Sequence, residues 1–322
     1  MDIEEAISRF LTFKKSYCAD KSVVFYDEGL EYFANWLKGK ELAKVEDLTT
    51  DVITEYQVSL REKKSRNRTG KLKNGSVNTY MRSVRVFVKW LYDEELIEKQ
   101  LRLPRRIRED NDQIFVLTRD EVLDMDRAIF ESINTPLLDD DLRVILYLRN
   151  YLIVHMMLDE GLRIGEVVNL KRSDIDLEKR ILYVNKGKGR KDRILPIAEK
   201  IFIRLDQLLD NYREMKMEDE NLFYCFKLDR ILTMNTVKQY FAKLREKSGL
   251  KRLHPHILRH TFATSFIMSG GDVSVLKVLL GHSDIKVTQK YLHLATQYTI
   301  TKLDIYPLDV IFFPQRLDTL TT

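Results

Sequence analysis

The first hundred residues repeat one pattern of apolar and polar positions. Residues 2–17, 22–39, 49–64 and 74–97 each place apolar side chains at spacings of three and four, the period of an amphipathic helix. In the last of these segments an apolar stripe runs from Val77 to Leu91, while Arg82, Arg85 and Lys89 share another face. We therefore expect a first domain of four helices over residues 1–100.

The remaining chain combines helical patterns with one β-hairpin. Thr118 and Glu121 form a capping box before a helix, and a long apolar helix is followed by Gly161, placed for the left-handed conformation. Within residues 180–197 two short β-type runs flank a glycine-containing turn, and residues 233–250 form a helix closed by Gly249. The fold class is mainly α, with a mostly helical second domain over residues 114–322 that contains a small sheet.

Charge is distributed unevenly although the net charge is only +5. The stretch from position 61 to position 89 holds ten basic residues against one acid, and such a block attracts polyanions. We favour nucleic-acid contact over a merely solvated face, because the basic loop leads directly into the basic helix. The ten residues are Arg61, Lys63, Lys64, Arg66, Arg68, Lys71, Lys73, Arg82, Arg85 and Lys89.

A second basic run, residues 101–113, contains Pro104 and lacks apolar periodicity. It is interpreted as an interdomain linker. Its Arg105 and Arg106 either lie along nucleic acid or belong to a plain polar hinge, and the sequence leaves both open.

Composition excludes several classes of protein. No window is apolar enough for a membrane span, and the acidic N-terminus is not a signal peptide, so we expect a cytoplasmic location and no membrane partner. Cys18 and Cys225 lie far apart and suggest neither a zinc site nor a disulfide. Because no acidic cluster suited to magnesium is evident, neither a metal nor another cofactor is expected.

Five of the six histidines crowd into residues 254–294, beside an arginine and a tyrosine. His256 and Arg259 are three apart and share one side of a helix, whereas His260 points elsewhere. Farther on, Asp272 suits an N-cap, a short helix ends at Gly281, His282 falls in a turn, and Ser283 caps a final helix that carries Tyr291. Arginine, histidine and tyrosine together suit phosphodiester chemistry.

Four motifs in this order resemble the tyrosine recombinases, also called the phage integrase family. They are GLRIGEVVNL, NKGKGRKDRILPI, HILRHTFAT and LLGHSDIKVTQKYLHL. The resemblance implies a SAM-like core-binding domain over residues 1–100 and a catalytic domain from residue 114, ending in an exchange tail at about 296–322. The simple two-domain layout is similar to that of the Xer kind.

The resemblance implies which residues bind the scissile phosphate. Arg163 and Arg259 correspond to the arginines that clamp it, and His282 to a residue that hydrogen-bonds it. Glu166 matches an acidic position that supports Arg163. The alternatives to a catalytic role are structural: Arg163 forms only a salt bridge, and the histidines lie in the core with their hydrogen bonds satisfied by the protein.

Tyr291 corresponds to the nucleophile, with Tyr298 and Tyr306 as rivals. Lys188 corresponds to the lysine that protonates the leaving 5′ oxygen, and His256 to the histidine that assists proton transfer at the tyrosine. His260 is expected to support the site without touching phosphate. Three further basic residues of the hairpin turn are expected to meet DNA, and two of them are rivals of Lys188; they are Lys186, Arg190 and Lys191.

The implied reaction is site-specific recombination, in which strands are cleaved and rejoined through a 3′-phosphotyrosine and a Holliday junction. The implied partners are duplex DNA with a specific site, three further protomers that exchange C-terminal tails, and an accessory protein. The tail is too apolar to stay free and either docks on a neighbour or folds onto its own domain; its apolar residues are Ile305, Leu308, Val310, Ile311, Phe312 and Phe313. The alternatives are a type IB topoisomerase-like enzyme and a catalytically inert DNA-binding protein of the same fold.

Overall fold

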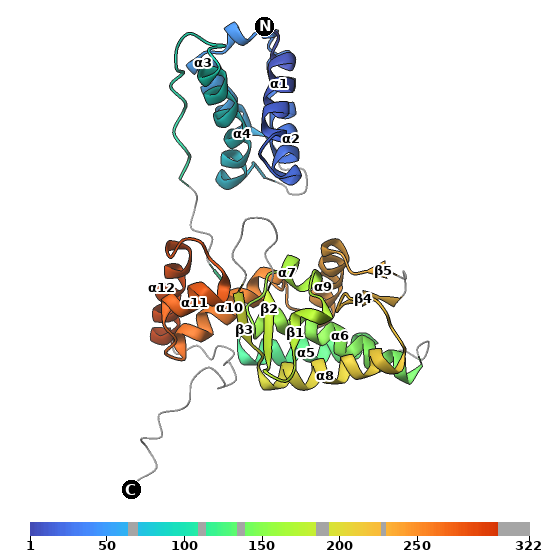
Figure 1. Ribbon diagram of the computed structural model, residues 1–322. Helices are drawn as coiled ribbons and strands as arrows, with labels where there is room; N and C mark the ends of the chain where they lie inside the picture. The colour runs from blue at the N-terminus through green and yellow to red at the C-terminus, as the bar shows by residue number, and fades with distance from the viewer. Residues whose placement is uncertain (64–69, 109–113, 134–138, 185–192, 227–229, 302–322) are drawn as a thin grey trace. The chain divides into compact units, whose positions relative to one another are not determined.

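The computed structural model describes residues 1–63, 70–108, 114–133, 139–184, 193–226 and 230–301, with residues 299–301 described by backbone alone. The chain divides into two compact units, Met1–Asp112 and Gln113–Thr322. Figure 1 shows the helices and strands of each unit.

The first unit contains the four expected helices: α1 (Ile3–Lys15), α2 (Asp20–Lys38), α3 (Thr50–Glu62) and α4 (Asn74–Asp93). The predicted stripe of α4 is buried from Val77 to Leu91, with Tyr80 only partly covered. It packs against Phe10 and Phe33, and burial of each such large side chain contributes about 1.5–3 kcal/mol. On its basic face Arg82 and Lys89 are exposed, whereas Arg85 is partly buried.

Residues 101–108 lie against this unit as a docked segment. Asn78 exchanges two hydrogen bonds with the backbone of Ile107, at 2.8 and 3.0 Å. Arg85 Nη2 donates to the carbonyl of Pro104 at 2.8 Å, and Gln57 donates to that of Arg105 at 3.2 Å. The described part of the predicted linker is therefore held on the first unit and is not a free hinge.

The second unit is mostly helical with two small sheets among its described residues, in agreement with the predicted fold class. Strands β1 (Ile175–Asp176), β2 (Ile181–Val184) and β3 (Arg193–Pro196) form an antiparallel sheet in that order. Val184 pairs with Arg193, so β2 and β3 are the two arms of the expected hairpin. A second pair, β4 (Tyr224–Cys225) and β5 (Arg230–Ile231), was not predicted.

The other helices of this unit contact the long helix α6 or the helices that pack on it. With α6 included, the helices are α5 (Arg119–Ile133), α6 (Asp140–Leu158), α7 (Ile164–Val168), α8 (Glu199–Glu214), α9 (Met234–Ser248), α10 (Pro255–Met268), α11 (Val273–Leu280) and α12 (Lys286–Thr301). Helix α6 contacts α5, α8 and α10, and its second half is buried on all sides. This explains its continuous apolar sequence. Helix α8 was not predicted, although its buried Ile201, Leu205, Leu208 and Tyr212 follow the helical period.

Two predicted helix boundaries are confirmed. Thr118 and Glu121 exchange capping-box hydrogen bonds of 2.9 and 3.3 Å before α5. Gly161, after α6, has φ +64°, and a Cβ atom there would lie 2.5 Å from Cδ1 of Phe262 on α10. The glycine therefore permits both the left-handed backbone and the close approach of the chain to α10.

We expect Gly161→Ala to destabilise the protein by clearly more than the about 1–2 kcal/mol that a left-handed alanine costs. The matched control is Gly249→Ala, because Gly249 has φ +72° but nothing within 4 Å of its would-be Cβ. Urea unfolding of both variants measures the difference. Equal losses would mean that the contact with Phe262 carries no cost.

Candidate active site

Arg259 is the most deeply embedded cation of the site. Helix α10 begins with Pro255 at its first turn, which suits proline because no amide hydrogen is needed there. One turn later the Arg259 side chain is 5% exposed; it donates to the carbonyl of Gly161 and, at 2.6 Å, to that of Leu280. Burial and the neighbouring Arg163 lower the pKa of Arg259 to about 9, so it remains charged at neutral pH.

His282 lies in the turn after α11, as predicted, and contacts Arg259. Gly281 ends α11 in the left-handed conformation, and Asp272 caps its start, both as expected. Arg259 Nη2 donates to His282 Nε2 at 3.2 Å, and Nδ1 then donates to Thr288 Oγ1 at 2.9 Å. Burial and the charge of Arg259 lower the pKa of His282 to about 4, so the ring is neutral at physiological pH.

The start of the last helix differs from the prediction. Helix α12 begins at Lys286, and the side chain of Asp284, not that of Ser283, accepts the backbone N–H of Lys286 at 2.9 Å. Ser283 lies too far before the first turn of α12 to reach it as a cap.

Arg163 is oriented by a carboxylate shared with a second arginine. Glu166 accepts from the Arg163 guanidinium at 2.9 Å and from its backbone N–H at 2.8 Å. It also accepts two hydrogen bonds from Arg193, at 2.9 and 2.8 Å, while Arg193 Nε donates to the carbonyl of Leu279 at 2.7 Å. Burial alone would raise the pKa of Glu166, but Arg193 and then Arg163 lower it to about 2. The arrangement leaves Arg163, with its side chain 33% exposed, the accessible member.

Tyr291 on α12 is 2% exposed and contacts His260 on α10. The Oη atom lies 2.8 Å from His260 Nδ1. Burial raises the pKa of Tyr291 to about 12, although Arg259 and Arg163 act against it. Burial and the charge of Lys290 lower the pKa of His260 to about 3. His260 therefore contacts the predicted nucleophile itself, because α12 crosses α10 on the side from which His260 projects.

His256 is exposed on the same helix, one turn before His260. Its ring lies beside that of His254, with centroids 6.4 Å apart. Burial, then His254, Arg259 and Arg163 lower its pKa, so it lies within the electrostatic reach of the arginines. The hairpin residues Lys186, Lys188, Arg190 and Lys191 fall outside the described residues.

Two cations of the site were not predicted. Arg193 follows the lysine turn on β3, and Lys290 lies half-buried with Nζ 5.0 Å from the centre of the Tyr291 ring. With Arg163 and Arg259 they make four cations, and the contacts above include one carboxylate, Glu166, which pairs with Arg163 and Arg193. Such an excess of buried positive charge favours an anionic ligand. No group of His, Cys, Asp or Glu side chains within the described ranges is placed to hold a metal ion.

Residues 129–298 match the phage integrase family. The chain belongs to that family, the tyrosine recombinases, and the predicted family and enzyme class are confirmed. It is similar to tyrosine recombinase XerC of Escherichia coli O139:H28, with 28% identity across 94% of this chain and 96% of that protein.

Solved structures of the family share the fold. The Tn1549 transposon integrase in complex with a circular intermediate DNA is 18% identical and has a TM-score of 0.68, covering 94% of this chain and 99% of that one. A lambda integrase dimer bound to a COC′ core site is 20% identical with a TM-score of 0.67, covering 90% and 95%.

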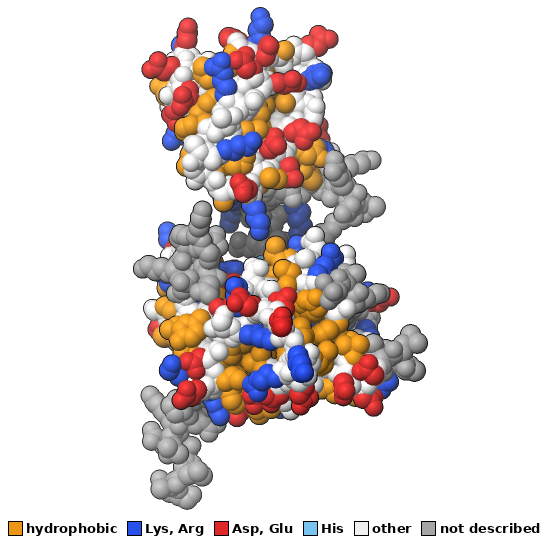
Figure 2. Space-filling view, turned by 45° about the vertical axis from the view of Figure 1, so that its right-hand side comes forward, with side chains coloured by type: hydrophobic (Ala, Val, Ile, Leu, Met, Phe, Trp, Pro, Cys, Tyr) orange, Lys and Arg blue, Asp and Glu red, His pale blue; other side chains and the backbone are white. Residues whose placement is uncertain are grey.

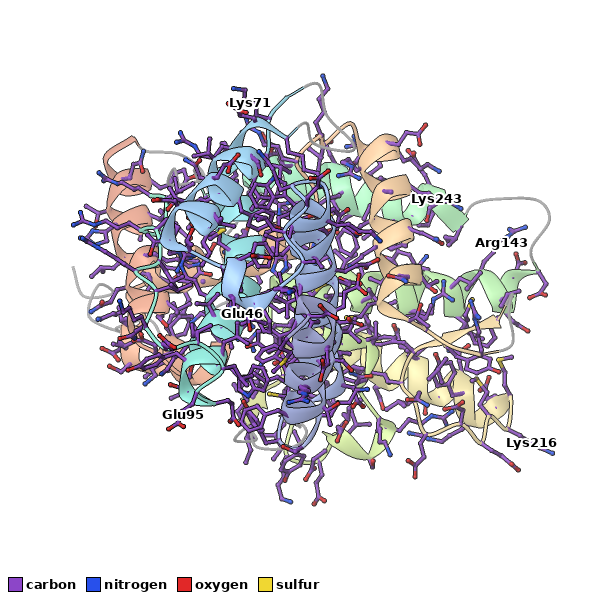
Figure 3. All side chains as sticks on the ribbon, turned by 90° about the horizontal axis from the view of Figure 1, so that it is seen from above. Glu46, Lys71, Glu95, Arg143, Lys216 and Lys243 are labelled. Atoms are coloured by element: carbon purple, nitrogen blue, oxygen red, sulfur yellow. The ribbon has the colours of Figure 1, made fainter. Side chains whose placement is uncertain are left out.

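The basic residues predicted to meet DNA in the first unit of this tyrosine recombinase occupy different environments. Arg85 is half-buried and committed to the backbone of the docked segment. Figure 2 shows acidic and basic side chains interspersed on the visible face of the unit, and Figure 3 shows Lys71 directed away from its helices. Lys64, Arg66 and Arg68 lie outside the described residues; the exposed ones are Arg61, Lys63, Lys71, Lys73, Arg82, Lys89, Arg105 and Arg106.

Replacing Arg193 by methionine is expected to cost about 3–5 kcal/mol of unfolding free energy, because Glu166 stays buried with only one arginine. The control is Arg213→Met, which breaks an exposed pair with Asp210 and should cost at most about 1 kcal/mol. Urea unfolding measures both. Similar losses would show that the Arg193–Glu166 pair adds nothing beyond a surface contact.

Acid is expected to destabilise the protein partly through His282. Its pKa is about 4 when folded and close to 6.5 when unfolded, so the unfolded chain binds the proton first and stability falls as the pH drops from about 6.5 to 4. His282→Asn should therefore lose less unfolding free energy between pH 7.5 and pH 5 than the wild type. His293→Asn, at an exposed position of α12, should behave like the wild type. An unchanged pH slope in His282→Asn would contradict the assignment.

Proposed function

We propose that this tyrosine recombinase cuts and rejoins duplex DNA at specific sites, with Tyr291 as the nucleophile. The observation that carries the proposal is the convergence of Arg163 and Arg259 on the turn at residues 280–282, with Tyr291 held against α10 by His260, the residue after Arg259. Both guanidiniums are oriented by groups of the protein, Arg259 by two carbonyls and Arg163 by Glu166. Pre-oriented cations are what a phosphoryl transition state requires.

In the proposed cleavage step the Tyr291 oxygen bonds to phosphorus and the bond from phosphorus to the 5′ oxygen breaks. Arg163 and Arg259 bind the nonbridging oxygens. His282, held beside Arg259, hydrogen-bonds the phosphate when its Nε2 carries the hydrogen. Lys188 protonates the leaving 5′ oxygen, and His256 assists the transfer of the proton from the tyrosine. The products are a 3′-phosphotyrosine and a 5′ hydroxyl.

Rejoining uses the 5′ hydroxyl of a partner strand, so the phosphodiester energy is retained. We propose that four protomers act on two DNA sites through a Holliday junction and exchange their tails, about residues 296–322. The reaction takes place in the cytoplasm, with an accessory protein where the DNA site requires one. The first unit serves as the core-binding domain, and its exposed basic residues meet DNA backbone. The XerC similarity and the DNA complexes of the transposon and lambda integrases support this assignment.

The test is covalent capture of DNA. Purified protein is incubated with nicked duplex fragments of the genome that encodes it, because a nick near the cleavage point lets the short 5′ piece diffuse away and traps the 3′-phosphotyrosine. Wild-type protein should form an adduct that resists denaturation, and Tyr291→Phe should form none. Tyr298→Phe, which removes the hydroxyl that donates to the carbonyl of Ile114, should retain adduct formation.

The captured duplex also separates the alternative functions. A topoisomerase would relax supercoiled plasmid lacking this sequence, whereas a recombinase exchanges strands between two copies of it. If the wild-type protein captures no fragment, the alternative of a catalytically inert DNA-binding protein is favoured.

A further inference from the structure

Glu160 is a buried acid in the Gly161 turn, residues 159–163, which the proposed mechanism leaves unused. It directly precedes Gly161, whose carbonyl accepts from Arg259, and it lies three residues before Arg163. Glu160 is 2% exposed, and its Oε1 accepts the backbone N–H of Ala198 at 2.8 Å. Its Oε2 is also buried and has no hydrogen-bond partner among the described residues.

The hydrogen bond to Ala198 joins the Gly161 turn to the segment that follows β3. Ala198 is the N-cap of α8 and lies two residues after the end of β3. Strand β3 begins with Arg193, which pairs with Glu166 through two hydrogen bonds. The segments 160–166 and 193–198 are therefore linked at both ends. Most of the Gly161 turn lies between these two links, so its position is fixed from both sides.

The charged groups around Glu160 are paired with one another. Asp159 pairs with Lys200 of α8 at 2.9 Å and with His155 of α6 at 2.6 Å. The other ring nitrogen of His155 lies 2.8 Å from a carboxylate oxygen of Asp126 on α5. Burial alone would lower the pKa of His155, but Asp159 and then Asp126 raise it. Each of these two cations therefore has a carboxylate other than that of Glu160.

The acid itself is neutral at neutral pH. Burial raises the pKa of Glu160 to about 8; the Ala198 N–H opposes this rise and Asp159 adds to it. Above that pH a second negative charge develops beside Asp159. Because a buried charge without its own partner costs far more than a neutral acid, ionisation favours a rearrangement of the Gly161 turn that admits water.

We propose that Glu160 is a positioning residue of the active site. By accepting the N–H of Ala198 in its protonated form it holds the Gly161 turn in place. It acts on the reaction through Arg163 and through the carbonyl that orients Arg259, and it makes their placement dependent on pH. This inference rests on the function proposed above. Both guanidiniums must meet one phosphate, and a displacement of about 1 Å can slow such a step by about 10²-fold.

Substitutions separate positioning from a loss of stability. Glu160→Leu leaves the Ala198 N–H without an acceptor, and single-turnover cleavage of the captured duplex at saturating protein should slow by about 10–10²-fold at pH 7, with DNA affinity unchanged. Glu160→Gln keeps the acceptor and should restore most of the rate. The control is Tyr212→Phe, which removes a buried hydrogen bond to the carbonyl of Leu222 in the same unit and should cleave like the wild type. Undiminished cleavage by Glu160→Leu, or an equal loss in Tyr212→Phe, would overturn the proposal.

The pH profile tests the role of the proton. Glutamine cannot ionise, so cleavage by the wild type should fall relative to that by Glu160→Gln by about tenfold between pH 7 and pH 9. Stability should follow the same proton. The unfolded chain releases it near pH 4.3 and the folded chain near pH 8, so the wild type should lose more unfolding free energy than Glu160→Gln as the pH rises from about 4.3 to 8. A rate ratio that stays constant with pH contradicts the proposal.

Infrared difference spectra between the wild type and Glu160→Gln observe the proton directly. A protonated carboxyl should be present at pH 7 and disappear as the pH rises through about 8. An ionised carboxylate at pH 7 would refute the inference even if Glu160→Leu did not fold. If wild-type protein forms no adduct with DNA, the proposed function fails; if adducts form and are indifferent to Glu160, only the present inference fails.

Discussion

The buried guanidinium of Arg259 is the contact on which the geometry of the catalytic unit depends. A charge that leaves water must be paired or fully hydrogen-bonded, and Arg259 satisfies this with carbonyls that follow or end two helices, Gly161 after α6 and Leu280 at the end of α11. The carboxyl end of a helix carries partial negative charge. One side chain on α10 thereby fixes the turn that carries Arg163 and the turn that carries His282.

Around Glu166 the described residues hold more positive charge than this carboxylate neutralises. Glu166 is shared between Arg163 and Arg193, so neither Arg259 nor Lys290 has a carboxylate of its own within the contacts described above. Burial, and after it the repulsion between these cations, lowers the pKa values of Arg259 and of the neighbouring histidines. Such strain is tolerated where a ligand relieves it, and a phosphodiester has the charge and the acceptors to do so.

Sequence reasoning succeeded where the relevant residues lie on one local element. The pair Arg163 and Glu166, the cap at Asp272 and the left-handed Gly161 all follow from spacings of a few residues, and each has the predicted local contact or conformation. The family motifs extended this to residues far apart in the chain. Arg193 could have been suspected from its place directly after the lysine turn, but the strand pattern alone marked it as an ordinary polar position.

The points that sequence reasoning missed share one physical cause. Spacing within one helical turn does not determine which neighbouring element a side chain contacts. His256 and His260 differ by four positions and point to similar sides of α10, so only the path of α12 decides which of them reaches Tyr291. Lys290 precedes Tyr291 directly, yet its proximity to the ring depends on the same crossing. Ser283 and Asp284 are both good caps, and the start of α12 selects the second.

Arg85 shows why a count of basic residues is a weak guide to a DNA surface. It was grouped with Arg82 and Lys89 on one face of α4, but it donates to the Pro104 carbonyl and lies half-buried. Burial, then Arg106, lowers its pKa, so its charge is partly withheld from solvent. Its more direct effect is to hold residues 101–108 on the first unit, which leaves Arg105 and Arg106 exposed at fixed positions beside α4. A basic segment fixed in this way loses less conformational entropy on meeting a phosphate backbone than a free hinge would.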